Sequence, residues 1–165
     1  MKTLWLARHA HAGEAGPGVR DFDRPLSERG RRAVPAVAIR LKSREASLPQ
    51  RIVCSPAART LETAELFALQ FGLEEADIQP EGALYLAGES RLLESCRQLD
   101  NRFEAIMLVG HNPAVTELLN GFCDNVSVDH VPSGGCACLL FDVHGWNEVA
   151  PGMAELHSFD HPSIG

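Results

Sequence analysis

The feature of this sequence that most constrains its fold is a regular alternation of short apolar runs with amphipathic segments of helical period. Residues 2–8 and 105–109 are apolar almost throughout, as in strands buried on both faces of a sheet. The other expected strands are shorter and lie at 51–54, near 78, at 136–142 and at 155–159. The last two predict a hairpin across the turn at 144–147.

Helical segments separate these strands. The expected helices are 27–42, 55–71, 90–99 and 113–119. Ser27 is the expected N-cap of the first, and Pro35 inside it predicts a kink or a later start. Ser55 is the expected N-cap of the second helix, with Pro56 at its first position. The alternation predicts an α/β fold: a three-layer sandwich in which helices cover both faces of a mostly parallel sheet.

Length and charge narrow the possible functions. The 165 residues fit one domain spanning 1–165. A formal charge of -7 argues against nucleic-acid binding, which depends on clustered Lys and Arg. No apolar stretch approaches the ~20 residues of a membrane span, and the start lacks a signal-peptide pattern. We therefore expect a cytoplasmic protein without membrane contact, and a monomer because no heptad or exposed apolar run is evident.

The cysteines do not indicate a metal or redox site. Their number is five, which is odd, and their spacing is irregular, so they are expected to be buried thiols. No spacing typical of zinc ligands occurs, and no metal or cofactor is expected. Four residues separate Cys54 from Arg59, one fewer than in the cysteine-phosphatase loop, so Cys54 is expected to be a buried strand thiol.

Cationic and imidazole side chains follow three of the expected parallel strands. Arg8 and His9 end the first, Arg59 lies just after the second, and His111 follows the strand at 105–109. The carboxyl ends of parallel strands meet at one edge of a sheet, where helix N-termini also favour anions. The sequence therefore predicts a site of phosphate size at this edge.

The residue types suggest the chemistry of that site. A neutral imidazole can attack phosphorus, and neighbouring guanidinium groups disfavour its protonated form. One histidine would attack, while the arginines and the other histidine hold the equatorial oxygens of the phosphoryl group. The two arginines argue against a metal ion between the histidines.

Four segments at these positions resemble one family. The segments "ARHAHA", "DRPLSERG", "VCSPAARTLETA" and "VGHNP" are similar to those of the histidine phosphatase superfamily, which has a phosphoglycerate-mutase-like fold. The short length resembles its SixA-type branch of phosphohistidine phosphatases. The resemblance implies that His9 becomes phosphorylated and that Arg8, Arg59 and His111 complete a phosphate pocket. The flanking residues to which it gives a substrate-binding role are Arg24, Ser27 and Asn112.

Two departures from the superfamily pattern bear on the substrate. Ala10 stands where Gly is usual, a change also found in the SixA-like branch, and the chain is too short for a helical lid. Glu81 is the acidic candidate for a proton donor, although it matches the pattern poorly. A site with a weak acid favours phosphohistidine, whose leaving imidazole solvent can protonate. Arg24 has the alternative of pairing with Asp21 or Asp23 in the same loop.

The resulting hypothesis is a metal-independent phosphatase that forms a phosphohistidine intermediate and acts on phosphohistidine in a protein. One alternative is a small-metabolite phosphomonoesterase or mutase acting on a small phosphate ester. Another is a module that binds phosphate or a phosphoprotein without turnover. His11 has no evident role in any of these and is expected at the loop surface.

Overall fold

A single six-stranded sheet forms the centre of the computed structural model, which describes residues 1–45 and 47–162. The strands are β1 (Lys2–Arg8), β2 (Arg51–Cys54), β3 (Ile78–Pro80), β4 (Ala105–Gly110), β5 (Cys136–Phe141) and β6 (Ala154–Asp160). Their order across the sheet is β3-β2-β4-β1-β5-β6. The β3, β2, β4 and β1 strands pair in parallel, whereas β5 is antiparallel to both β1 and β6. The predicted parallel sheet and the terminal hairpin are therefore both confirmed.

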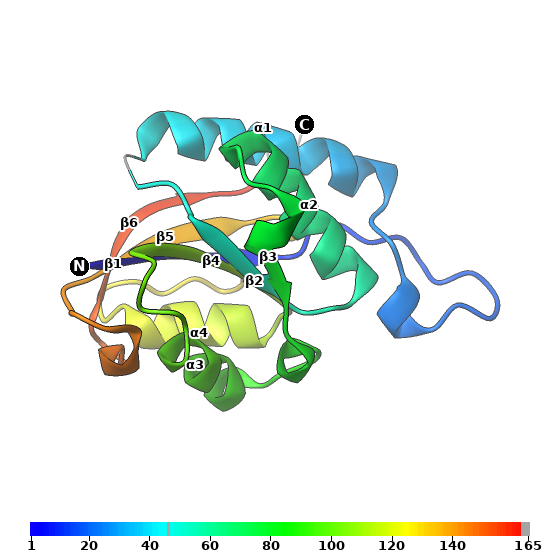
Figure 1. Ribbon diagram of the computed structural model, residues 1–165. Coiled ribbons are helices and arrows are strands. Elements are labelled where there is room, and N and C mark those ends of the chain that lie inside the picture. Colours follow the sequence, from blue (N-terminus) through cyan, green and yellow to red (C-terminus); the bar gives the residue numbers. More distant parts are fainter. Residues whose placement is uncertain (46, 163–165) are drawn as a thin grey trace.

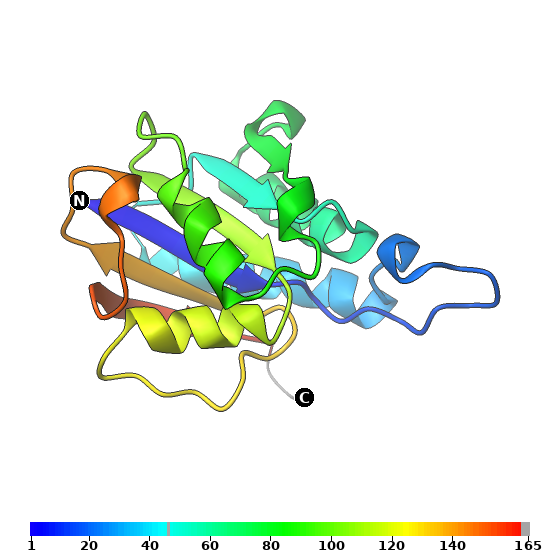
Figure 2. The same cartoon turned by 90° about the horizontal axis from the view of Figure 1, so that it is seen from below.

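Helices cover both faces of this sheet. They are α1 (Glu28–Arg44), α2 (Ala58–Phe71), α3 (Glu89–Arg97) and α4 (Ala114–Phe122). Figure 1 shows α1 and α2 on one side of the sheet and α3 and α4 on the other, and Figure 2 shows the second pair from below. This arrangement is the predicted three-layer sandwich.

The apolar strand β1 explains why two hydrophobic cores form. Leu4 and Leu6 face the core under α3 and α4, whereas Trp5 and Ala7 face the core under α1 and α2. All four are at most 1% exposed. Burying a large apolar side chain stabilises the fold by about 1.5–3 kcal/mol, so both faces of β1 are held firmly.

Of the two predicted N-caps, that of α1 is confirmed and that of α2 is not. Ser27 caps α1, its Oγ accepting a hydrogen bond from the backbone N–H of Gly30 at 3.1 Å. Pro35 lies inside α1, so the helix neither ends nor starts there. The prediction that Ser55 caps the next helix was wrong, because α2 begins at Ala58. The hydroxyl of Ser55 instead contacts His111, a partner that local sequence does not indicate.

Within residues 1–45 and 47–162, no helix combines the length and the apolar character needed to cross a membrane.

Candidate active site

The carboxyl ends of three adjacent strands bring the predicted pocket residues together. His9 directly follows β1, His111 directly follows β4, and Arg59 lies in the first turn of α2 after β2. The ring centroids of His9 and His111 are 5.4 Å apart. Nη2 of Arg59 lies 3.5 Å from Nδ1 of His111. These side chains therefore form one cluster at one edge of the sheet.

The imidazole of His9 is oriented by the backbone. Its Nδ1 lies 2.8 Å from the carbonyl oxygen of Ala10. A carbonyl can only accept, so Nδ1 carries the proton and Nε2 keeps its lone pair. The main chain of His9 is held on both sides, because its N–H donates to Gly110 and its carbonyl accepts from Gly134. The free nitrogen of His9 is thus the one available for nucleophilic attack.

Arg8 belongs to the same cluster, because its charge acts on both imidazoles, and carbonyl oxygens fix both Arg8 and Arg59. Nη1 of Arg8 donates to the carbonyl of Val131 at 3.0 Å, and Nη1 of Arg59 donates to the carbonyl of Asp21 at 2.8 Å. In each arginine the buried Nε finds no hydrogen-bond partner among the described residues. The two fixed guanidinium charges beside the imidazoles make this edge of the sheet favourable for an anion.

Ser55 is a contact of the cluster that sequence reasoning missed. Nη2 of Arg59 faces Nδ1 of His111, so the proton of that imidazole belongs on Nε2. Nε2 then donates to Oγ of Ser55 at 2.8 Å. Ser55 therefore fixes the orientation of His111, and the Ser-Pro pair before α2 matters through this contact rather than as a helix cap.

The environment keeps both imidazoles neutral. Burial lowers the pKa of His9 to about 3, with smaller contributions from His111, Arg59 and Arg8. Burial, followed by Arg59, lowers the pKa of His111 to about 4. The sequence analysis expects the neighbouring guanidinium groups to lower these pKa values. In the structure, the loss of water contacts on burial is the larger cause. A neutral His9 keeps the lone pair of its Nε2 across the physiological pH range.

We expect NMR titration of the imidazole signals to show His9 and His111 still neutral at pH 5. In a short unstructured peptide carrying residues 5–13, the same ring should titrate near 6.5. The folded state then binds fewer protons than the unfolded state below about pH 6.5, so the free energy of unfolding should fall on acidification. Titration of both rings near pH 6.5 in the folded protein would contradict the buried geometry.

Asp21 and Tyr85 also contact the cluster, although the sequence does not predict this. Asp21 begins a 3-10 turn, and its Oδ2 accepts from Nη2 of Arg59 at 3.1 Å and from the hydroxyl of Tyr85 at 2.6 Å. The Tyr85 hydrogen bond, followed by those from Arg59 and Arg24, lowers the pKa of Asp21 to about 2. The ring of Tyr85 lies 5.7 Å from that of His111. An ionised carboxylate therefore already occupies Nη2 of Arg59.

The predicted flanking residues of the loop lie beside this turn. Nε of Arg24 donates to Asp21 at 3.1 Å, and its Nη1 donates to the carbonyl of Gly13 at 3.0 Å. The alternative of a loop ion pair is thus present. Oγ of Ser27 lies 2.7 Å from Nδ1 of His11, which gives the half-buried His11 a partner that the sequence did not reveal. Substrate binding by Arg24 and Ser27 stays a prediction.

The described side-chain hydrogen bonds of Asn112 and Glu81 do not reach Arg59 or either imidazole, although Asn112 shares the Val131 carbonyl with Arg8. The amide of Asn112 donates to the carbonyl of Val131 at 3.0 Å and accepts from Thr116. These contacts tie α4 to the loop that also holds Arg8, so they give Asn112 a positioning role. Glu81 accepts from Nε2 of Gln79 at 2.7 Å. The carboxylate that contacts the cluster within the described residues is therefore that of Asp21, whereas Glu81 was the predicted acidic residue.

Close packing of α1 against the segment after His9 yields a stability prediction. A Cβ added at Gly30 would lie 2.2 Å from the carbonyl oxygen of His11. Overpacking of this kind costs about 1–3 kcal/mol, although Gly→Ala usually stabilises a helix. Urea unfolding should therefore show Gly30→Ala to be destabilised. The control Gly82→Ala, where nothing lies within 4 Å of the added Cβ, should unfold close to the parent.

Comparisons with known proteins show which family this chain resembles. The sequence model of the histidine phosphatase superfamily (branch 1) matches residues 4–85. An uncharacterized protein of Mycobacterium tuberculosis is 28% identical over 92% of this chain and 98% of its own. A chloroplastic, uncharacterized protein of Arabidopsis thaliana is 33% identical over 67% of this chain and 54% of its own.

Solved structures show the same architecture. A SixA protein from Agrobacterium tumefaciens, assigned as a phosphohistidine phosphatase, is 28% identical with a TM-score of 0.81, covering 98% of this chain and 99% of that one. One from Nakamurella multipartitia, with the same assignment, is also 28% identical with a TM-score of 0.81, covering 99% and 97%. The protein histidine phosphatase SixA complexed with tungstate shares the fold at 18% identity and a TM-score of 0.79, covering 97% of each chain.

The chain belongs to the histidine phosphatase superfamily, in its SixA-type branch, and is a phosphatase of the hydrolase class.

Proposed function

We propose that this phosphatase works through a phosphorylated His9 and removes the phosphoryl group from phosphohistidine on a protein. The observation that carries the proposal is the free Nε2 of His9 within a cluster of two guanidinium groups and a second imidazole. Similarity to SixA proteins assigned as phosphohistidine phosphatases supports the choice of substrate.

The reaction has two steps. Nε2 of His9 attacks phosphorus, the P–N bond to the substrate imidazole breaks, and that imidazole takes a proton from solvent. Water then attacks phosphorus of phospho-His9, its P–N bond breaks, and inorganic phosphate leaves with His9 restored. In both steps Arg8 and Arg59 neutralise the equatorial oxygens, where the negative charge is spread.

The donors of the cluster suit an anion rather than a metal ion. Arg8 and Arg59 carry positive charge and have only N–H donors, and the Nε2–H of His111 already points to Ser55. The guanidinium groups supply the electrostatic stabilisation that a metal ion supplies in other phosphoryl-transfer sites. We therefore propose that catalysis is independent of added metal.

The acid–base character of the site supports a nitrogen leaving group. Asp21 is held ionised by Tyr85 and Arg59 and is not poised to donate a proton in the free enzyme. A general acid contributes ~10²- to 10⁴-fold when an alkoxide must leave, and an imidazole that solvent protonates needs it less. The site is thus better matched to phosphohistidine than to unactivated esters.

The test is phosphate release from a phosphohistidine protein compared with sugar and nucleotide monophosphates, all with EDTA present. We expect kcat/KM for phosphohistidine to exceed that for every ester by at least 10²-fold. Preference for one ester would favour the small-metabolite alternative instead. Tight binding without turnover of any substrate would favour a binding module.

Asp21 yields a prediction about substrate affinity. Its carboxylate holds the Nη2 of Arg59 that a phosphoryl oxygen would use, so the two anions compete. Asp21→Asn should lower the inhibition constant of inorganic phosphate by about 5- to 50-fold, as expected when a close charge–charge contact is removed. The control Asp23→Asn alters the partner of Arg20 in the same turn and should leave that constant nearly unchanged. Weaker phosphate binding in Asp21→Asn would show that the carboxylate helps the pocket rather than competing.

A further inference from the structure

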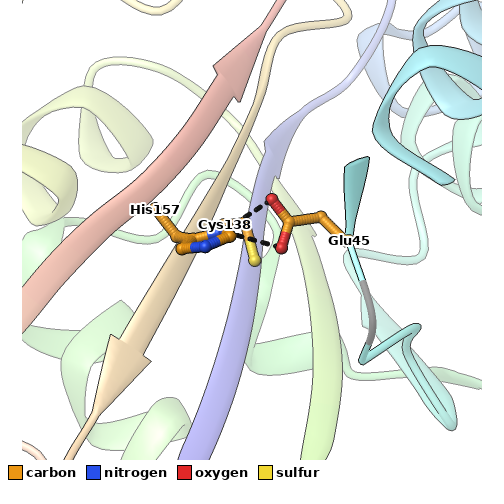
Figure 3. A group of neighbouring side chains, drawn as sticks. All are labelled: Glu45, Cys138 and His157. Carbon is orange, nitrogen blue, oxygen red and sulfur yellow. Dashed lines mark hydrogen bonds and ion pairs between the residues drawn. The ribbon is translucent and has the colours of Figure 1, made fainter. Parts of the chain in front are cut away.

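Away from the phosphate cluster, three side chains of metal-ligating type converge from different elements. Glu45 is the C-cap residue of α1, Cys138 lies on β5, and His157 lies on β6. Figure 3 shows the three side chains turned toward one another. One ligand atom from each lies within 4.8 Å of the others, and Nδ1 of His157 lies 2.8 Å from the carboxylate of Glu45.

A β-bulge places two successive residues of β6 on this cluster. Cys138 pairs with Ser158 and Leu139 pairs with Leu156, so His157 is the extra residue of the bulge. Neighbours in a regular strand point to opposite faces, yet His157 and Ser158 both contact Glu45. Bulges often re-aim a side chain toward a site, and this one turns an imidazole toward a carboxylate and a thiol.

Burial and hydrogen bonding give the cluster the form of a built site. Cys138 is fully buried, and the side chain of Glu45 is 5% exposed. The side chain of His157 is 47% exposed, which leaves a path from solvent. The hydroxyl of Ser158 donates to Oε1 of Glu45 at 2.5 Å and thereby orients the carboxylate, as residues behind a metal ligand commonly do.

The nearby positive charges are engaged elsewhere. Arg40 and Arg44 both pair with Asp160, two residues beyond Ser158. The cluster itself would carry the charges of one carboxylate and one thiolate. This balance suits a divalent cation.

We propose that Glu45, Cys138 and His157 form a zinc site with three protein ligands and a water molecule in the fourth position. Thiolate, imidazole and carboxylate are the ligands that Zn²⁺ prefers, and three of them plus water complete a tetrahedron. Binding replaces the proton of the Cys138 thiol, which is released to solvent. The imidazole of His157 moves its proton from Nδ1 to Nε2 and binds through Nδ1.

The site is separate from the phosphate cluster. Cys138 lies opposite Trp5 on β1, four residues before His9, which corresponds to ~13 Å along an extended strand. A bound ion would link the end of α1 to both β5 and β6. The proposal therefore does not rest on the phosphatase mechanism, and either can fail without the other.

The test is a titration of the metal-free protein with Co²⁺ and then Zn²⁺, in a His9→Asn background that removes one active-site imidazole. We expect one Co²⁺ per chain, a thiolate-to-cobalt charge-transfer band, its loss when Zn²⁺ is added, and a Zn²⁺-dependent rise in Tm. Cys138→Ser should abolish the band, and His157→Ala should weaken Zn²⁺ binding by at least 100-fold. Cys136→Ser, two residues away on the same buried face, should retain both.

Several results would overturn the proposal. One is the absence of a charge-transfer band in protein that carries Cys138. Another is binding of equal strength in the His157→Ala variant, which keeps the buried thiol and changes a side chain that is largely exposed. Equal loss of the band in Cys136→Ser and Cys138→Ser would also show that the metal is not held by the proposed thiol.

Discussion

His9→Asn should lower kcat for phosphohistidine hydrolysis by about 10⁴- to 10⁶-fold, the scale on which loss of a nucleophile acts in enzymes with covalent intermediates. Asparagine keeps a donor near the carbonyl of Ala10, where Nδ1 of His9 now lies at 2.8 Å, so the local fold should be preserved. The variant lacks the nitrogen that we propose to attack phosphorus. Substrate binding should change far less than kcat, because the arginines of the cluster are untouched.

The matched control is His144→Asn, which makes the same change at an exposed turn between β5 and β6. Its kcat should equal that of the parent. Circular dichroism and thermal unfolding of both variants would show whether folding is intact. A folded His9→Asn protein that retains more than a tenth of the parent kcat would rule out His9 as the nucleophile.

Arg59→Ala should lower kcat/KM by about 10³- to 10⁵-fold, as loss of an arginine that stabilises a phosphoryl transition state does elsewhere. Arg59 is 3% exposed, contacts His111 and presents a buried Nε without a described partner. Its removal deletes the central positive charge of the cluster. Arg59→Lys should recover part of the rate, because lysine restores charge without the planar pair of donors.

Folding should survive this substitution better than activity does. The ion partner of Arg59 is Asp21, whose side chain is 47% exposed and can be solvated once Arg59 is gone. Arg102→Ala is the control, since Arg102 pairs with Asp100 before the start of β4, at the opposite end of the parallel strands. A kcat/KM for Arg59→Ala within tenfold of the control would contradict the assigned role.

Strand ends explain why so much of the cluster could be predicted. The strands β1 and β4 end directly before His9 and His111, and parallel strands place their carboxyl ends together. Arg59 follows from the same logic, one turn into α2. The alternation of apolar strand segments with helical segments therefore predicted both the three layers of the fold and the edge of the sheet at which these side chains lie.

Contacts between distant loops could not be read in this way. Tyr85 reaches Asp21 across 64 positions of sequence, and Ser55 reaches His111 across 56. No local pattern marks such pairs, so the sequence does not predict the contact of Asp21 with Tyr85 or that of Ser55 with His111. The cluster of Glu45, Cys138 and His157 was hidden for the same reason, because its members come from three elements.

Trapping of the phosphorylated enzyme tests the central claim most directly. Substrate labelled in its phosphoryl group would be mixed with enzyme, quenched in alkaline denaturant during turnover, and the label mapped by peptide analysis and ³¹P NMR. We predict label that is stable to base, lost in mild acid, formed as fast as turnover, and attached to Nε2 of His9. Label on Nδ1 or on another residue, or label that forms more slowly than product, would contradict the mechanism.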